Sequence, residues 1–405
     1  EMRRIVAACQ ATGLRYRVLP AIAAVLNGSV SLDQLRQVRI EDLLRREPIR
    51  LELPALAADI GGKTVLVTGA AGSIGSELSR QIALHGPRRL VLLDQAESPL
   101  YFVQRELSES YPELDLVAIV GDIRDPRDIE RAVVECGPER VFHAAAYKHV
   151  PLMEDNTRAG FETNVLGTRA VIEACEGAGV EKFVLISTDK AVRPSSVMGA
   201  SKRAAELLLL EAAERSPHIG WYAVRFGNVL GSAGSVIPLF KRQLGTGKPL
   251  TVTHPEVTRY FMTIPEAVQL ILQATLLPEA RGRIAMLDMG QPVRILDLAR
   301  DLIRLSGRTE GVDAEIVITG LRPGEKLHEE LTSPEETAVA TEVDKISVLL
   351  HEDFEAPDAM EVLCPPSGTS WEECGDAEIR ERLMRLAHAC DEAAQPVETS
   401  SISAR

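Results

Sequence analysis

The chain has 405 residues, of which 45% are hydrophobic and 26% are charged, so it can bury a sizeable core and is excluded as a largely disordered protein. Lysine and arginine total 45 against 59 aspartate and glutamate residues, which gives a formal net charge of -14. A chain this acidic is excluded as a non-specific nucleic-acid or anionic-membrane binder, because attraction to phosphate requires a positive surface.

Six cysteines occur without a CxxC pair, and no histidines stand at zinc-finger spacing. We therefore expect free thiols in a reducing, cytoplasmic compartment and no metal site. No apolar run reaches the ~20 residues that a transmembrane helix requires, so we expect no membrane contact from this part of the chain. Because it begins with Glu1 rather than methionine, we expect it to be a piece of a longer protein.

Residues 1–60 are predicted to be a connector from a preceding domain. Ser31 suits the N-cap of an amphipathic stretch over 32–46. From residue 61 to about 245, short β-branched runs alternate with helical patterns. This alternation predicts an α/β fold of the Rossmann type, a doubly wound parallel sheet covered on both faces. The strands are expected at 64–68, 90–94, 116–120, 141–144, 183–187 and 222–226.

Residues 246–335, with parts of 225–245, are predicted to form a smaller α/β substrate-binding lobe. Helices are expected there at 265–276 and 295–305, and a strand at 315–318. Residues 336–390 are a C-terminal extension to which the sequence assigns no role. The polar stretch 391–405 is expected to be disordered.

A glycine-rich turn follows the first expected strand, with Gly69, Gly72 and Gly75 in a GxxGxxG spacing. Glycines there let the backbone approach a pyrophosphate, whose charge meets free N–H groups at the start of the next helix, beginning near Ser73 and Ile74. The sequence therefore predicts a dinucleotide site. A tight turn without any ligand is the competing interpretation.

Asp94 ends the second expected strand, where a carboxylate can accept hydrogen bonds from the adenosine ribose. The same carboxylate would repel a 2′-phosphate, and residues 95–98 contain no lysine or arginine. NAD is therefore favoured over NADP. The alternative role for Asp94 is a helix cap at the end of the strand.

Several motifs in chain order resemble the polysaccharide-biosynthesis (CapD-like) UDP-N-acetylglucosamine 4,6-dehydratases of the extended short-chain dehydrogenase/reductase superfamily. The similarity covers about 30–335, and it is closest to the long, membrane-anchored members. It implies cofactor contacts at Asp122, Ile123, Ala144 and Ala145. The motifs are the glycine turn, Asp122-Ile123, 143–146, 187–194, 198–202, 225–231, 258–263 and 322–326.

Met198 stands where most of the superfamily has the tyrosine of a Tyr-x-x-x-Lys pair, whereas Lys202 is present. A thioether cannot take a proton near neutral pH, so the usual phenolate base is missing. This departure matches the long, membrane-anchored dehydratases. The resemblance implies that Lys202 binds the nicotinamide ribose. The competing interpretations are core packing for Met198 and an exposed helix lysine for Lys202.

The resemblance implies oxidation of a UDP-sugar at carbon 4, loss of water across carbons 5 and 6, and reduction at carbon 6. By analogy, Lys190 is the base at carbon 5 and Asp189 is the acid at the carbon 6 hydroxyl. Because Met198 cannot take a proton, we expect Thr188 to orient the carbon 4 hydroxyl, with Asp189 or a water as the final proton acceptor. Burial would raise the pKa of the carboxyl, whereas burial and nearby positive charge would lower that of the lysine. A solvated turn pair is the alternative for Asp189 and Lys190.

The same resemblance implies that Asn228, Arg259 and Arg322 contact the diphosphate of the substrate. Lys148 is expected to line the sugar pocket, although an exposed loop is an equal alternative. Glu325 is expected at the substrate, or else in an ion pair with Lys326. A homo-oligomer is expected, because the superfamily commonly pairs helices such as those near 97–109 and 158–175.

Two other functions compete with the dehydratase. A UDP-hexose 4-epimerase would also oxidise carbon 4, but it needs neither an elimination acid nor a carbon 5 base. A catalytically silent NAD-binding scaffold or sensor would account for the missing tyrosine. The first is disfavoured by the Asp189-Lys190 pair, and the second predicts that Lys190→Ala changes no activity.

Overall fold

The computed structural model describes residues 53–351, 365 and 370–392. The helical stretch expected at 32–46 lies outside the described residues, as do all but two residues of the expected tail at 391–405. Of the expected connector, the structure describes the end, which is helix α4 (Leu53–Ile60).

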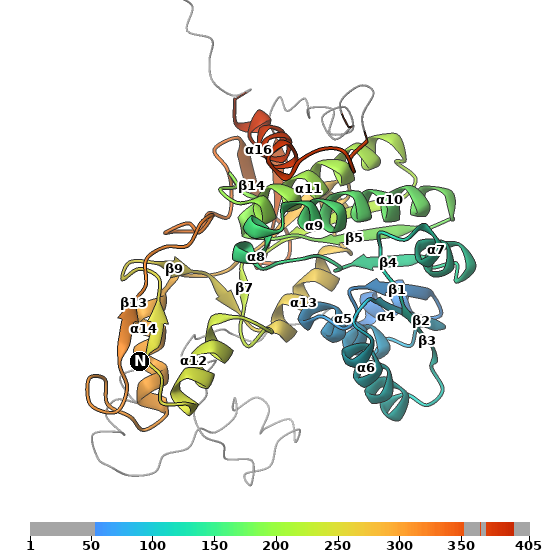
Figure 1. The fold of residues 1–405 in the computed structure, drawn as a ribbon. Coiled ribbons are helices and arrows are strands. Elements are labelled where there is room, and N and C mark those ends of the chain that lie inside the picture. Colours follow the sequence, from blue (N-terminus) through green and yellow to red (C-terminus); the bar gives the residue numbers. More distant parts are fainter. Residues whose placement is uncertain (1–52, 352–364, 366–369, 393–405) are drawn as a thin grey trace, which may run out of the picture.

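The described chain is organised around a nine-stranded sheet with the order β14-β15-β11-β6-β5-β4-β1-β2-β3 (Figure 1). All neighbouring strands pair in parallel except β15, which is antiparallel to both β11 and β14. Strand β1 stands where the strand order reverses, which is the doubly wound arrangement, so the predicted fold class is confirmed. The strands are β1 (Thr64–Thr68), β2 (Arg89–Asp94), β3 (Asp115–Val120), β4 (Arg140–His143), β5 (Lys182–Ile186), β6 (Gly220–Arg225), β11 (Arg283–Leu287), β14 (Glu336–Ala340) and β15 (Ile346–His351).

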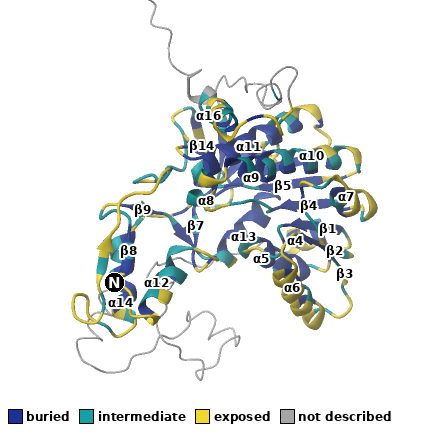
Figure 2. Cartoon of the chain, in the orientation of Figure 1, coloured by how far each residue is buried: buried dark blue, intermediate teal, exposed yellow. Residues whose placement is uncertain are grey.

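Helices cover both faces of this sheet, and each face has its own apolar core (Figure 1). On one face, α4, α5 (Ser73–Ala83), α6 (Glu97–Ser110) and α13 (Ile264–Ala274) bury their apolar residues. The other face is covered by α8 (Val150–Asp155), α9 (Thr157–Phe161), α10 (Thr168–Gly177), α11 (Val197–Arg215) and α16 (Asp376–Glu392), with α7 (Pro126–Ile129) at its edge. Figure 2 shows the consequence, because the sheet and α11 are buried while α6 presents an exposed outer side.

A third apolar core lies in a smaller lobe made by α12 (Val236–Gly245), α14 (Ile295–Leu305), β8 (Leu250–Val252) and β13 (Ile316–Ile318). In α14 the buried residues recur every three or four positions, as an amphipathic helix requires. Two short pairings, β7 (Asn228–Val229) with β10 (Phe261–Met262) and β9 (Thr258–Arg259) with β12 (Val293–Arg294), lie between this lobe and the sheet.

The sheet also takes strands from ranges assigned elsewhere by the sequence. β11 and α13 fall within the expected lobe of 246–335, yet they belong to the sheet and its helical layer. The extension of 336–390 supplies β14, β15 and α16, and α16 packs on α11. No helix among the described residues is both long enough and apolar enough to span a bilayer.

Candidate active site

The turn between β1 and α5 brings the backbone unusually close to the neighbouring strand end. Gly69 has a φ of +67°, and a Cβ there would lie 2.6 Å from the backbone nitrogen of Ala145. A Cβ on Gly75 would lie 2.1 Å from the carbonyl oxygen of Gly69. Only glycine fits either position, and Gly72, the N-cap of α5, provides no side chain to occupy the first N–H groups. The helix start is therefore open to an anionic ligand.

Asp94 braces this turn from the end of β2. Its carboxylate accepts hydrogen bonds from the backbone N–H groups of Ala71 and Ala96, both at 2.9 Å. It also lines a small cavity with Asp122, Ile123, Ala144 and Ala145. The Asp94 side chain therefore accepts hydrogen bonds from the backbone at the end of its strand, as a cap does, and also lines a cavity next to the turn.

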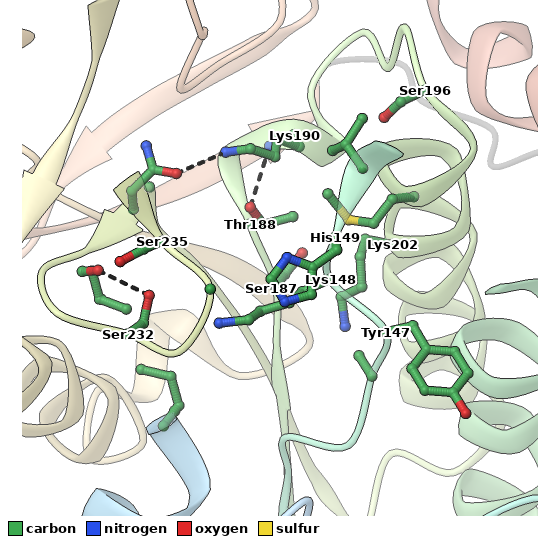
Figure 3. Close-up of a pocket in the computed structure, with 18 of the residues that line it drawn as sticks. Tyr147, Lys148, His149, Ser187, Thr188, Lys190, Ser196, Lys202, Ser232 and Ser235 are labelled. Carbon is green, nitrogen blue, oxygen red and sulfur yellow. Dashed lines mark hydrogen bonds between the residues drawn. The ribbon is translucent and has the colours of Figure 1, made fainter. Parts of the chain in front are cut away.

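A cavity of about 560 Å³ opens next to the turn, at the carboxyl ends of β1, β4 and β5 and facing the smaller lobe. Figure 3 shows Thr188, Lys190 and Lys202 around it, with Lys148 and His149 approaching from the segment after β4. The structure brings together most of the predicted site residues in this cavity, namely Gly69, Gly72, Ser73, Ile74, Gly75, Ala144, Lys148, Thr188, Lys190, Met198, Lys202, Asn228, Arg259, Arg322 and Glu325.

Asp189 departs from its expected place. It lies in a single helical turn after β5, where Thr188 caps the turn, and its side chain is fully buried and does not line the cavity. Its Oδ1 accepts hydrogen bonds from the hydroxyl of Thr188 at 3.0 Å and from Nζ of Lys190 at 2.9 Å. A solvated turn pair is therefore wrong. The structure instead shows a buried ion pair.

Lys190 lies in a more negative environment than the sequence suggested. Besides Asp189, it contacts Glu329 at 3.5 Å and the side-chain oxygen of Asn228 at 3.3 Å. Burial opposes the charge of Lys190, but the negative charges of Asp189 and Glu329 outweigh burial and hold its pKa above the ordinary lysine value. The expectation of a lowered pKa for Lys190 is wrong.

Met198 and Lys202 are one turn apart on α11, whose start is capped by Ser196 through a hydrogen bond to the N–H of Gly199. Both side chains line the cavity, and Lys202 is only 5% exposed, so an exposed helix lysine is wrong. Burial lowers the pKa of Lys202 to about 8, and the charge of Glu206 offsets this only in part. Met198 also packs in the core of this face.

The arginines expected to hold a diphosphate lie on the lobe side of the cavity. Arg259 pairs with Glu325 at 3.1 Å and with Glu329 at 3.6 Å. Arg322 is exposed, and its backbone N–H donates to Glu325. Lys326 pairs with Glu330 rather than with its neighbour, so the alternative of a Glu325–Lys326 ion pair is wrong.

The sequence did not predict the place of Glu329 in the site or the buried surroundings of His143. Glu329 lines the cavity from the segment after Arg322, a run of charged residues that is typical of a solvated surface. His143 is fully buried between the hydroxyls of Thr68 and Thr168, and burial lowers its pKa to about 3. Among the described residues, no cluster of three or more His, Cys, Asp or Glu could hold a metal ion.

Comparison with known proteins shows that the chain matches a family model and is similar to several named proteins. The family model described as "Polysaccharide biosynthesis protein" matches residues 65–351. The capsular polysaccharide biosynthesis protein CapD of Staphylococcus aureus is 48% identical over 81% of this chain and 55% of its own length. This chain thus spans little more than half of that relative.

The names of two further relatives specify different reactions. The UDP-N-acetylglucosamine 4,6-dehydratase (inverting) of Campylobacter jejuni is 31% identical over 70% of this chain and 81% of its own. The UDP-glucose 4-epimerase of Rickettsia massiliae is 35% identical over 69% and 81%, respectively. Among solved structures, Pen from Bacillus thuringiensis aligns with a TM-score of 0.66 at 30% identity, covering 72% of this chain and 88% of that one.

Proposed function

Because the chain belongs to the polysaccharide biosynthesis protein family, we propose that it is an NAD-dependent UDP-N-acetylglucosamine 4,6-dehydratase acting in bacterial surface glycan synthesis. Its product is a UDP-4-keto-6-deoxy-N-acetylhexosamine. The observation that carries the proposal is one cavity that joins a nucleotide-type glycine turn to Thr188, Lys190 and Lys202. A relative bearing this activity in its name supports it.

The residues around the glycine turn fit NAD. The missing side chains at Gly69 and Gly75 leave the helix start open to a pyrophosphate, and Asp94 lines the adjoining cavity where a ribose would lie. When bound, NAD supplies the redox chemistry, accepting a hydride from sugar carbon 4 and returning it to carbon 6. Lys202 lies at the same cavity and would hydrogen-bond the ribose next to the nicotinamide.

Side chains of the protein then carry out the proton transfers. Thr188 presents a hydroxyl that can orient the carbon 4 hydroxyl, and Met198 contributes packing without proton transfer. The proton of the carbon 4 hydroxyl passes through Thr188 to Asp189, which accepts a hydrogen bond from the Thr188 hydroxyl. A ketone at carbon 4 acidifies the carbon 5 proton, which Lys190 removes once it is uncharged. The carbon 6 hydroxyl leaves as water by taking the proton that Asp189 received. Such general acid and base groups typically contribute about 10²–10⁴-fold each.

The diphosphate would be held by Asn228, Arg259 and Arg322 on the lobe side. Arg259 is paired with Glu325 and Glu329, which hold its guanidinium group at the cavity. A bidentate arginine contact to phosphate is charge-assisted and directional, which suits it to replace such pairs.

A UDP-hexose 4-epimerase is the second candidate, because relatives carry that name. Incubation with UDP-N-acetylglucosamine in deuterated water, with proton NMR of the product, separates the two. We expect a 6-deoxy-4-keto sugar with solvent deuterium at carbon 5. A UDP-N-acetylgalactosamine product without any keto sugar would contradict the dehydratase.

A further inference from the structure

Glu329 is a buried carboxylate that lines the cavity with one oxygen unused. Its side chain is only 4% exposed. Its Oε1 lies 3.5 Å from Nζ of Lys190 and 3.6 Å from Nε of Arg259. Its Oε2 has no hydrogen-bond partner among the described residues. Buried polar atoms are rarely left unpaired, so an unpaired one calls for a functional explanation.

Lys190 needs a proton acceptor before it can act as a base. In the free protein its ammonium group is held by Asp189 and Glu329. An ammonium ion has no lone pair and cannot remove the carbon 5 proton. One of these two carboxylates must therefore take the proton first.

Glu329 is better placed than Asp189 for this step. Oδ1 of Asp189 already accepts from both Thr188 and Lys190, and the side chain does not reach the cavity. Its Oδ2 is also unpaired, but it lies toward Gly227, where an added Cβ would lie only 3.0 Å away. Glu329, in contrast, lines the cavity, where its Oε1 lies beside Lys190 and its Oε2 is unpaired among the described residues.

We propose that Glu329 is the proton-accepting partner of Lys190, an inference that rests on the dehydratase function proposed above. When the bound sugar displaces water, an N–H bond of Lys190 breaks and an O–H bond forms on Glu329, so both groups become uncharged. The lone pair of Lys190 then takes the carbon 5 proton, and the resulting ammonium group, whose protons exchange with solvent, later protonates carbon 5. Glu329 finally gives its proton back, and the pair ends in its starting state.

Because Glu329 acts through Lys190, it is a positioning residue, and its substitution must affect the same step as Lys190. Glu329→Gln keeps the shape of the side chain but cannot accept a proton. Its matched control is Glu330→Gln at the next position, which is partly exposed and pairs with Arg193 and Lys326 away from Lys190.

The experiment measures two steps of the reaction in deuterated water. Oxidation at carbon 4 is trapped by quenching with borodeuteride, and exchange at carbon 5 is detected by proton NMR. For Glu329→Gln and for Lys190→Ala we expect carbon 5 exchange and keto-sugar formation to fall by about 10²-fold or more, while carbon 4 oxidation persists. The double variant should be no slower than either single variant, because coupled residues are not additive.

Calorimetric titration with UDP checks that the site is otherwise intact, and we expect Glu329→Gln to bind UDP at least as tightly as the wild type does, because the substitution removes a negative charge beside Arg259. The inference would be overturned if Glu329→Gln exchanged the carbon 5 proton as fast as Glu330→Gln does. It would also be overturned if Glu329→Gln lost UDP binding, or if it lost carbon 4 oxidation together with carbon 5 exchange. A wild-type enzyme that makes no keto sugar would instead refute the proposed function, and the inference with it.

Discussion

Ser187 donates a hydrogen bond of 2.6 Å to Oε1 of Glu206, joining the end of β5 to the helix that carries Lys202. Glu206 is completely buried and also pairs with Arg225 at 2.8 Å and Arg203 at 3.0 Å. Arg225 in turn pairs with Glu336 at the start of β14. This buried network lies directly behind the residues that line the cavity.

Removing the charge of Glu206 should therefore destabilise the whole fold. Glu206→Gln leaves two buried arginines short of a counter-charge, and breaking such a pair costs about 3–5 kcal/mol. Urea denaturation monitored by circular dichroism measures the loss. The control is Glu109→Gln on α6, whose pair with Arg105 is exposed and which should change stability by about 0.5 kcal/mol or less. Equal effects of the two variants would contradict this account of the network.

An added methyl group at Gly75 should weaken NAD binding. The new Cβ would overlap the carbonyl oxygen of Gly69 and distort the turn that faces the pyrophosphate. We expect the NAD dissociation constant of Gly75→Ala to rise by about 10-fold or more, which corresponds to about 1.4 kcal/mol. Calorimetry measures it. The control is Gly177→Ala, where a Cβ meets no atom within 4 Å, and this variant should bind NAD as the wild type does. If Gly75→Ala also bound NAD as tightly as the wild type, the result would argue against a nucleotide at this turn.

The charge of Lys202 should set an alkaline limit to activity. Because burial lowers its pKa to about 8, Lys202 is charged below that pH and becomes neutral as pH rises through it. If the ammonium group supports the reaction, kcat falls above about pH 8. Lys202→Arg keeps its charge well beyond this range, since a guanidinium pKa exceeds about 12, and its residual activity should lack the alkaline fall. An unchanged alkaline limb in this variant would assign the limb to another group.

Met198 should be replaceable and Lys190 should not. Met198→Leu conserves volume, which usually costs less than about 1.5 kcal/mol, and it removes no proton-transfer group. We expect this variant to retain most of its keto-sugar formation in a discontinuous alkali assay. Lys190→Ala, by contrast, should lose about 10²-fold or more while UDP still binds. Activity lost in Met198→Leu, with the fold intact, would mean that the sulfur has a direct role.

The sequence predicted β1 to β6 because each is a short run rich in apolar residues and helical patterns separate these runs. It also located the glycine turn, since the spacing of Gly69, Gly72 and Gly75 after a strand has a direct geometric cause. Lys202 was placed correctly because residues four apart on a helix share a face.

Other parts of the site depend on contacts that no spacing rule contains. Glu329 lies far along the chain from Lys190, and the structure alone reveals that it joins Asp189 in raising the pKa of the lysine, against the expected direction. Asp189 is likewise fully buried, with its Oδ2 beside Gly227, a contact between segments that are far apart in the sequence. β14 and β15 escaped prediction because their antiparallel pairing breaks the alternation that identified the other strands.

The two antiparallel strands also cover the outer side of β11, so that the largely exposed strand β14 forms this edge of the sheet instead. Without β15, the backbone hydrogen-bonding groups along the outer side of β11 would form an open sheet edge, a template on which another chain can pair. A version of the chain ending before β14 would expose that edge and leave Arg225 without Glu336. Such a shortened protein should precipitate, even though every residue of its cofactor turn would still be present.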